Sequence, residues 1–285
     1  MNIYDSIIQD NRSTSDNSLA SGINNNSNGL MNITRTTVRR NITEAIAFFI
    51  SAGGVHNNSN GDMFIMESAI YENMGIRGAG VNNNSGGTVN ITNTTISHNT
   101  AIDEGGNIFN NSSGDIFIDS STIAAGSSQS NEGGNIYDKD SSGRIFLINT
   151  IIANPLSGLN CAGEPVTSQG YNLETGNTCN LTAAGDQLNT NPMLGLLRNN
   201  GGPTFTHAIT TESPAFDTGN VTCPPPGTDQ RGIIRPQAAR CDIGAYEAAF
   251  EFVPTLSEWG LIAMAGILGI VGFMVMRRRE VTAKV

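Results

Sequence analysis

Apolar and polar residues alternate in six short segments of the first half of the chain, and these segments align without gaps over eleven positions. Positions one and three are apolar in almost every segment, position eight is Ile or Val, and position eleven is often Asn. Alternation with a period of two, followed by small polar residues, predicts a strand, a bend and a second strand. The segments are MNIYDSIIQDN from Met1, MNITRTTVRRN from Met31, MFIMESAIYEN from Met63, VNITNTTISHN from Val89, IFIDSSTIAAG from Ile116 and IFLINTIIANP from Ile145.

A third element precedes most of these segments, and it consists of a glycine-rich turn, an apolar residue and a tail of Asn and Ser, as in GAGVNNNSGGT from Gly78. We therefore expect three short strands per repeat, with Gly and Asn at bends that need left-handed backbone angles. Such a repeat predicts an all-β fold, a parallel β-helix of about six rungs over residues 1–153. Asn side chains at equal positions of successive rungs would form hydrogen-bonded ladders. Leucine-rich and ankyrin-type repeats do not fit, because their Leu spacing and helical half-repeat are absent from the sequence.

Composition supports a β-rich fold and narrows the choice of partners. Only 14% of residues are charged, whereas Gly occurs 33 times, so long surface helices rich in Lys and Glu are not expected. The formal net charge is -10. An acidic chain offers no basic surface that could neutralise phosphates, and we expect no nucleic-acid partner.

The repeat pattern is already under way at the first residue, since Met1 aligns with Met31 and Val89. A solenoid that begins inside a rung leaves an uncapped edge. Residues 1–30 also lack the basic region and the apolar stretch of a secretory signal peptide. We therefore hypothesise that this chain is a fragment whose signal peptide and further rungs are encoded upstream. An in-frame stop codon directly upstream, with no repeats before it, would contradict this hypothesis.

The C-terminal tail carries the second strong pattern. Residues 260–276 (GLIAMAGILGIVGFMVM) contain no charge, and they lie between Trp259 and the triplet of Arg277, Arg278 and Arg279. As a helix they would measure about 26 Å, close to the hydrocarbon thickness of a bilayer. The arginine triplet would place the C-terminus in the cytoplasm and the preceding chain outside. The sequence thus predicts one transmembrane helix that anchors an exported protein, with a buried core helix as the alternative.

All four cysteines lie in residues 154–249, where the repeat pattern ends: Cys161, Cys179, Cys223 and Cys241. An even number of cysteines in an exported domain favours disulfides. Their spacing suggests Cys161 with Cys179 and Cys223 with Cys241, while two other pairings stay open. A zinc site is the weaker interpretation, because no CxxC motif occurs. We expect an irregular, disulfide-containing cap that covers the last rung.

Candidate catalytic groups are few. A polysaccharide lyase or a glycosidase on this fold would need convergent carboxylates and a basic residue. The carboxylate pairs are Asp103 with Glu104 and Asp138 with Asp140, and the basic residues nearby are Lys139 and Arg144. Neighbouring rungs do not repeat these groups, and His56 and His98 are expected to be ordinary outward residues. We therefore assign no catalytic, metal-binding or cofactor-binding residue.

Two stretches of the C-terminal half resemble known families. The string NPMLGLLRNNGGPTFTHAITTESPAFDTGN from Asn191, followed by TDQRGIIRP from Thr228 and CDIGAYE from Cys241, resembles the choice-of-anchor Q domain of bacterial surface proteins. The resemblance spans residues 149–247, and a cap region of this type would occupy residues 154–249. It implies a right-handed parallel β-helix that is related in shape to the pectate-lyase fold.

The tail, residues 250–285, resembles the IPTL-type C-terminal sorting signal through VPTLSEWG from Val253, the apolar span and the arginine cluster. Val253 replaces the usual leading Ile. The resemblance implies that an exosortase-type membrane transpeptidase of a Gram-negative bacterium recognises this signal, cleaves near it and passes the exported part to the cell surface or its matrix. The residues to which it assigns the sorting role are Pro254, Thr255, Leu256, Trp259, Gly260, Arg277, Arg278 and Arg279.

Taken together, these patterns predict an exported β-helix protein of the cell surface with a structural or adhesive role. Its expected partners are the sorting transpeptidase, the membrane through the C-terminal helix, and a surface or matrix polysaccharide. The alternative is a carbohydrate-active β-helix enzyme, a lyase or a hydrolase, whose active rungs are missing or unrecognised.

Overall fold

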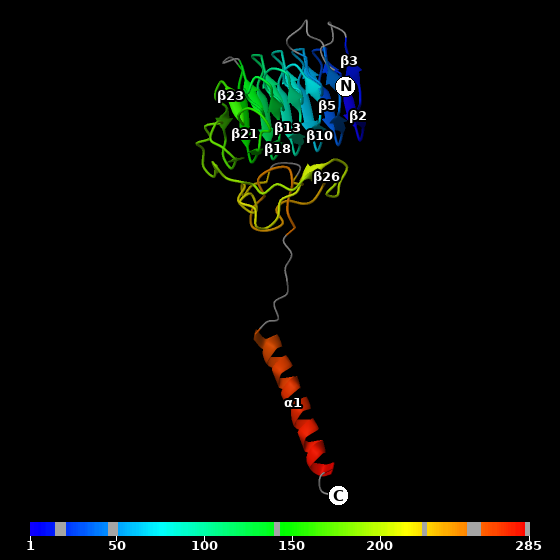
Figure 1. The fold of residues 1–285 in the computed structure, drawn as a ribbon, viewed down its shortest axis with the longest axis vertical. Helices are drawn as coiled ribbons and strands as arrows, with labels where there is room; N and C mark the ends of the chain where they lie inside the picture. Colours follow the sequence, from blue (N-terminus) through cyan, green and yellow to red (C-terminus); the bar gives the residue numbers. More distant parts are fainter. Residues whose placement is uncertain (15–20, 45–50, 140–142, 224–226, 250–257, 283–285) are drawn as a thin grey trace. The chain divides into compact units, whose positions relative to one another are not determined.

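The structure is a computed structural model that describes residues 1–14, 21–44, 51–139, 143–223, 227–249 and 258–282. The chain divides into two compact units, residues 1–249 and residues 250–285. The first unit is a parallel β-solenoid (Figure 1), because strands of successive turns pair side by side and in parallel. The prediction of an all-β solenoid is confirmed.

Four sheets run along the solenoid, and we name them A to D. Sheet A contains β1 (Asn2–Tyr4), β5 (Met31–Thr34), β9 (Met63–Met66), β13 (Val89–Thr92), β17 (Ile116–Asp119), β21 (Ile145–Ile148) and β24 (Thr167–Ser168). Sheet B contains β2 (Ile7–Gln9), β6 (Thr37–Arg39), β10 (Ala69–Tyr71), β14 (Thr95–Ser97), β18 (Thr122–Ala124), β22 (Ile151–Ala153) and β25 (Leu173–Glu174). Sheet C contains β3 (Arg12–Ser13), β7 (Ile42–Thr43), β11 (Met74–Gly75), β15 (Thr100–Ala101) and β19 (Ser127–Ser128). Sheet D contains β4 (Ile23–Asn25), β8 (Val55–Asn57), β12 (Val81–Asn83), β16 (Ile108–Asn110), β20 (Ile136–Asp138) and β23 (Cys161–Gly163).

The register of the strands follows the alignment of the six sequence segments. In sheet A, Ile65 pairs with Ile33 on one side and with Ile91 on the other, so that equal repeat positions lie side by side. Each of the six segments begins at a strand of sheet A, namely β1, β5, β9, β13, β17 and β21. The chain therefore makes five full turns between the first and the last of them. Each turn has four strands and not three, because a two-residue strand of sheet C follows the residue at position eleven.

Aliphatic side chains fill the inside of the solenoid. Positions one, three and eight of the second to sixth segments, together with the first residue of the strands of sheet D, form one continuous buried cluster, and Ile3 and Ile8 of the first segment pack against it. In the middle turn Val89, Ile91, Ile96 and Val81 are all inaccessible to solvent. Burial of each such side chain contributes about 1.5–3 kcal/mol, which makes this stack the main source of stability of the repeats.

The bends use left-handed residues that are mostly not glycine. Positions five and ten of the segments have φ between 45° and 59°, and the residues there are Asp, Arg, Glu, Asn, His, Ser and Ala. Several glycines are needed for a different reason, the close approach of neighbouring turns. A Cβ atom on Gly80 would lie 2.5 Å from the carbonyl oxygen of Asn107 in the next turn. The expectation that Gly and Asn supply the left-handed bends is therefore only partly right.

A ladder of buried amides runs along the solenoid beside sheet B. Each Asn Nδ2 donates to the Oδ1 of the Asn in the next turn, at 2.8 to 3.0 Å. The donors and acceptors follow the order Asn11, Asn41, Asn73, Asn99, Asn107, Asn135 and Asn160, and Asn160 donates to the carboxylate of Glu174 at 3.2 Å. The predicted ladder at position eleven is present up to Asn99. Beyond it, Gly126 occupies position eleven, and the amides come from the glycine-rich element instead.

A second buried ladder lies on sheet D. Asn25, Asn57, Asn83 and Asn110 each donate to the residue in the next turn, and the last acceptor is the Asp138 carboxylate at 3.2 Å. Both ladders consist of side chains that are almost fully buried beyond their first turn. Since buried amides are costly unless they are hydrogen-bonded, the ladders let the repeat keep polar side chains within its wall.

The cysteine-containing region of the first unit, residues 154–249, has two parts that pack in different places. Strands β23, β24 and β25 extend three of the sheets, and the Cys161–Cys179 disulfide with Leu181 joins the aliphatic core at its end. Residues 191–249, which we call the lateral segment, pack instead on the outer face of sheet B. The prediction that the whole region covers the last rung is therefore wrong for the lateral segment.

Polar contacts between the lateral segment and sheet B reach back over several turns. Thr95 Oγ1 donates to Gln230 Oε1 at 2.6 Å, and the amide of Ala245 donates to Thr122 Oγ1 at 3.0 Å. The segment contains one antiparallel pair, β26 (Leu197–Arg198) and β27 (Thr206–His207). The second disulfide of the protein lies in this segment and joins Cys223 to Cys241, so both of the suggested pairings are present.

The second unit contains the helix α1 (Glu258–Thr282). Residues 260–276, the predicted membrane span, lie within it. Across the residues that the structure describes, no helix combines enough length with enough apolar character to cross a bilayer. The predicted transmembrane helix is thus not supported.

Candidate functional site

The first predicted carboxylate pair is occupied by an ion pair. Arg77 contacts Asp103 Oδ2 at 2.6 Å through its terminal nitrogen and Glu104 Oε2 at 2.9 Å through Nε. The same guanidinium lies over the ring of Phe109 at 5.7 Å. Burial raises the pKa of Glu104, and the charge of Arg77 opposes this effect. Both carboxylates are thus paired with one arginine of the preceding turn.

Only one member of the second predicted pair, Asp138, lies in the described residues. Asp138 accepts the last hydrogen bond of the ladder on sheet D, and Asp140 lies outside the described residues. Lys139 is exposed, and the backbone amide of Arg144 donates to Asp115 Oδ1 at 3.0 Å. His56, expected to be an outward residue, is fully buried within sheet D.

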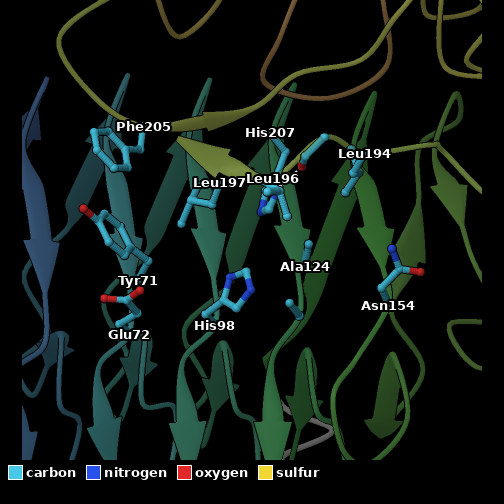
Figure 2. Close-up of a pocket in the computed structure, with 12 residues that line it drawn as sticks. Tyr71, Glu72, His98, Ala124, Asn154, Leu194, Leu196, Leu197, Phe205 and His207 are labelled. Carbon is cyan, nitrogen blue, oxygen red and sulfur yellow. Dashed lines mark hydrogen bonds between the residues drawn. The ribbon is translucent and has the colours of Figure 1, made fainter. Parts of the chain in front are cut away.

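A pocket of about 400 Å³ lies between sheet B and the lateral segment. On the solenoid side it is lined by positions nine and ten of consecutive turns, among them Glu72, His98 and Asn154. Figure 2 shows Glu72 and His98 at the ends of neighbouring strands, with Leu194, Leu196 and Leu197 supplied by the lateral segment. The pocket has this volume because Ala124 and Ala125 are small. The equivalent positions of the two preceding turns hold larger residues, Ser97 and His98 among them.

A chain of hydrogen bonds joins the two histidines of this pocket. His207 Nδ1 lies 2.7 Å from the carbonyl oxygen of Gly195, and its Nε2 lies 2.9 Å from Ser97 Oγ. The same hydroxyl lies 2.7 Å from His98 Nδ1. The two imidazole rings are stacked with their centroids 5.9 Å apart. Ser97 and His207, which are 110 positions apart in the sequence, are thus in hydrogen-bond contact.

The proton positions in this series of hydrogen bonds follow from its first acceptor, the carbonyl oxygen of Gly195. A carbonyl oxygen can only accept, so His207 Nδ1 carries the proton, and in the neutral ring Nε2 then accepts from the Ser97 hydroxyl. Ser97 has one proton to donate, and His98 Nδ1 must therefore donate to Oγ. The Nε2 of His98 is left as an unprotonated acceptor in a side chain that lines the pocket.

Both histidines are poised to be neutral. Burial lowers the pKa of His98, an effect that the charge of Glu72 partly opposes. Burial also lowers the pKa of His207, which is 5% exposed. The hydrogen-bond directions above are those of neutral imidazoles, in which one ring nitrogen donates and the other accepts.

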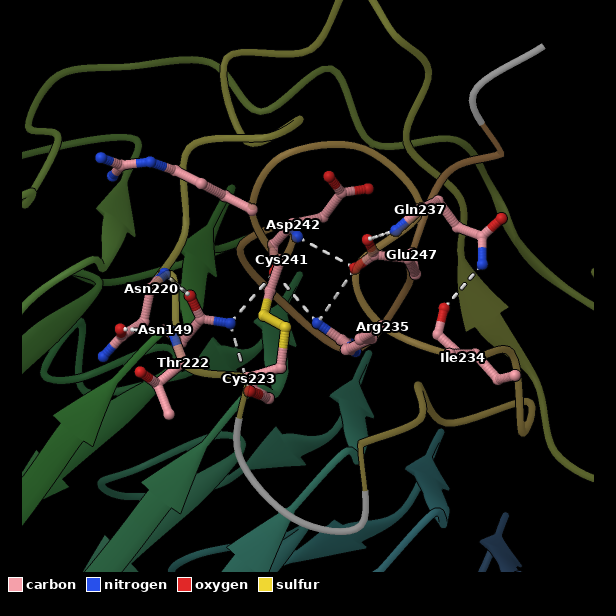
Figure 3. The surroundings of a disulfide bond; sticks show 12 residues. Asn149, Asn220, Thr222, Cys223, Ile234, Arg235, Gln237, Cys241, Asp242 and Glu247 are labelled. Atoms are coloured by element: carbon pink, nitrogen blue, oxygen red, sulfur yellow. Dashed lines mark hydrogen bonds and ion pairs between the residues drawn. A yellow bond between two sulfur atoms is a disulfide. The ribbon is translucent and has the colours of Figure 1, made fainter. Parts of the chain in front are cut away.

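The lateral segment is held together by a buried charge network (Figure 3). Arg235 donates to the backbone oxygens of Asp242 at 3.0 Å and of Gly244 at 2.7 Å, and its NH1 lies 3.6 Å from the Glu247 carboxylate. Burial, with the charge of Glu247, raises the pKa of Asp242 to about 7. Arg235, Asp242 and Glu247 are each at most 5% exposed, and the Cys223–Cys241 disulfide lies beside them.

The predicted sorting residues belong to the second unit. Pro254, Thr255 and Leu256 lie outside the described residues, whereas Trp259, Gly260 and the arginines 277–279 lie within α1. No group of His, Cys, Asp and Glu in the described residues could hold a metal ion.

The fold and the tail together define a class, a parallel β-solenoid that is followed by a C-terminal sorting segment. Residues 253–279 match the IPTL-CTERM motif, which implies export and sorting to the surface. No curated protein and no solved structure matches this chain. The resemblance to the choice-of-anchor Q domain stays a prediction.

Sequence reasoning did not find the group of Glu72, Ser97, His98 and His207. The sequence predicts His98 only as an ordinary outward residue, and it assigns no role to His207. Their proximity depends on how the lateral segment packs against sheet B. A signal was available in the pair Ala124 and Ala125, since small residues at two outer positions of one turn indicate a covered or vacant surface.

Proposed function

We propose that this protein is exported and sorted to the bacterial cell surface through its IPTL-CTERM segment, where it serves a structural or adhesive role in contact with surface or matrix polysaccharide. The observation that carries the proposal is the match of residues 253–279 directly after a solenoid unit that ends at residue 249. An exosortase-type membrane transpeptidase is the proposed partner in sorting. The disulfides Cys161–Cys179 and Cys223–Cys241 fit an oxidising, extracellular location.

The rigid periodic wall is the feature that suits a structural role. Two buried amide ladders and an uninterrupted aliphatic stack tie each turn to the next. Such a solenoid transmits contacts only between neighbouring turns and presents long lateral surfaces, a form well suited to extended partners.

Mass spectrometry of the protein released from the cell surface tests the sorting proposal. We expect a mature chain that lacks residues 259–279. A double substitution, Pro254→Ala with Thr255→Ala, should leave the unprocessed chain in the cell, whereas Lys284→Ala, outside the matched residues, should be processed normally. A surface form that still carries Trp259 to Arg279 would contradict the proposal.

The alternative, a carbohydrate-active enzyme, makes a different prediction. It would require the carboxylates of Asp103 and Glu104 to face a substrate, yet both are bound by Arg77. We expect no unsaturated or reducing products when the full chain is incubated with pectate or alginate. Products that disappear in Asp103→Asn would favour the enzyme instead.

A further inference from the structure

The pocket between sheet B and the lateral segment carries a carboxylate and an imidazole acceptor, and its described lining contains no Lys or Arg. Its polar lining includes the Glu72 carboxylate and the unprotonated Nε2 of His98. Arg40 interacts electrostatically with Glu72, but its guanidinium already donates two hydrogen bonds to Asp10, of 2.7 and 2.9 Å. A ligand group that contacts Glu72 or His98 Nε2 must therefore be a donor, and positive charge is favoured beside Glu72.

The opposite wall of the pocket is apolar. Leu194, Leu196 and Leu197 come from the lateral segment, and Leu196 is 83% exposed. An exposed leucine next to a carboxylate and an imidazole fits a ligand with one apolar face and one edge rich in hydrogen-bond donors. The pocket volume lies within the range of about 300–1,000 Å³ that small-molecule sites occupy.

Pyranose rings have this amphipathic form, because axial C–H groups form an apolar face and hydroxyls line the edge. An amino sugar adds an ammonium group that can pair with a carboxylate. Uronates lack such a group, and their own carboxylates would be repelled by Glu72. A lysine side chain could pair with Glu72 but would bring no hydroxyl for His98.

We propose that this pocket binds an amine-bearing saccharide unit, with its ammonium group at Glu72, a hydroxyl donating to His98 Nε2 and the apolar ring face against Leu196. This assignment deepens the proposed surface role and rests on it for the choice of a glycan ligand. The relay through Ser97 and His207 gives the pocket its specificity, because it fixes His98 in the tautomer that accepts at Nε2.

Calorimetric titration of the purified full-length chain tests the proposal. The probe is a tetramer of β-1,4-linked glucosamine at mildly acidic pH, where the amine is charged. The fully N-acetylated tetramer and a galacturonate tetramer serve as comparisons. We expect the glucosamine tetramer to bind at least about tenfold more tightly than either comparison, because only it can form the charge-assisted hydrogen bond.

Two substitutions locate the binding. Glu72→Gln keeps the shape of an exposed side chain and removes its charge, and it should weaken binding by about tenfold. Glu164→Gln changes another exposed carboxylate outside the pocket and should have no effect. Equal binding of the three tetramers, unchanged binding in Glu72→Gln, or equal competition by a lysine-containing tetrapeptide would each overturn the proposal.

The outcome is independent of sorting. If the surface form proves unprocessed while the glucosamine tetramer still binds through Glu72, the sorting proposal fails and the pocket assignment stands. If processing occurs as expected and the tetramer does not bind, only the pocket assignment fails.

Discussion

The turns of the solenoid and the lateral segment solve the same problem, the burial of polar groups, in opposite ways. In the turns, one residue type recurs, so that an Asn amide of one turn meets an Asn amide of the next. In the lateral segment, Arg235, Asp242 and Glu247 form a single network that occurs once. In the solenoid the same hydrogen bond recurs in turn after turn. In the lateral segment each member of the charge network occurs once, so the network depends on every member.

This contrast explains why the two regions differ in secondary structure. The described part of the lateral segment has only four residues in strands, β26 and β27, whereas each turn of the solenoid has strands on four sheets. A disulfide and a set of buried charges replace the ladder of backbone bonds that the segment lacks. We expect the lateral segment to be more sensitive to the loss of one side chain than any single turn.

The largest effect should come from Arg235→Met. Removing the guanidinium leaves the carboxylates of Asp242 and Glu247 buried without their cation, which costs about 3–5 kcal/mol of the free energy of unfolding. Denaturant unfolding measures the loss, and Arg198→Met, at an exposed arginine of the same segment, should cost less than about 0.5 kcal/mol. Addition of Glu247→Gln to Arg235→Met should restore part of the stability. A cost equal to that of Arg198→Met would show that the network is not important.

The two disulfides allow a matched comparison, because both close loops with a sequence separation of 18. Replacement of either pair by serine should cost about 3 kcal/mol if the constraint acts on the unfolded chain alone. Cys161 and Cys179 also belong to the buried core at the end of the solenoid. We therefore expect the Cys161→Ser, Cys179→Ser variant to lose more in thermal unfolding than the Cys223→Ser, Cys241→Ser variant, and the reverse order would contradict this assignment.

A smaller loss is expected from Asn99→Ala in the amide ladder. Asn99 donates to Ile70 O and Asn107 Oδ1 and accepts from Asn73, so its removal leaves several buried groups unpaired. A water molecule can take part of the vacated space, and we expect a cost of about 2 kcal/mol. Asn84→Ala, in a ladder that is partly exposed, is the control and should cost less than about 0.5 kcal/mol. Equal costs would mean that burial is not what makes the ladder valuable.

The smallest effect concerns pH and the contact between the two regions. The pKa of His207 is lowered by burial, so the unfolded chain binds a proton before the folded chain does. Its contribution is complete above its ordinary pKa of 6.5 and is lost as the pH falls through the folded value. His98 changes in the same direction, while Asp242 and Glu247, whose pKa values are raised, change in the opposite one.

Comparison of the parent chain with His207→Gln cancels the other groups. Melting temperatures at neutral and at mildly acidic pH should fall further on acidification in the parent chain than in the variant. An identical fall in both would show that His207 does not couple the lateral segment to pH.

The repeats could be predicted from the sequence because their pattern is local. Alternation at positions one, three and eight gave the strands, and Asn41, Asn73 and Asn99 indicated the ladder. The change of ladder after Asn99 was not predictable from position eleven, since Asn107 belongs to another element of the repeat. The strands of sheet C were missed because two residues after a bend carry no periodicity.

The site was less predictable, and the reason is also physical. Ser97 and His207 are 110 residues apart and meet only because the lateral segment packs along sheet B. Nothing in a local pattern fixes where an irregular segment docks. The paired carboxylates, in contrast, were visible in the sequence, but their partner Arg77 lies a turn away and was not considered.

The change of ladder between Asn99 and Asn107 has a consequence for how such a chain can be altered in length. Turns before Asn99 share one interchangeable format, so a duplicated or deleted copy among them keeps the amide spine continuous. Turns beyond it use a second format, and a unit exchanged across that boundary would bring two asparagines, or none, to the same place. The junction therefore divides the solenoid into two segments within which modules can be shuffled, and between which they cannot.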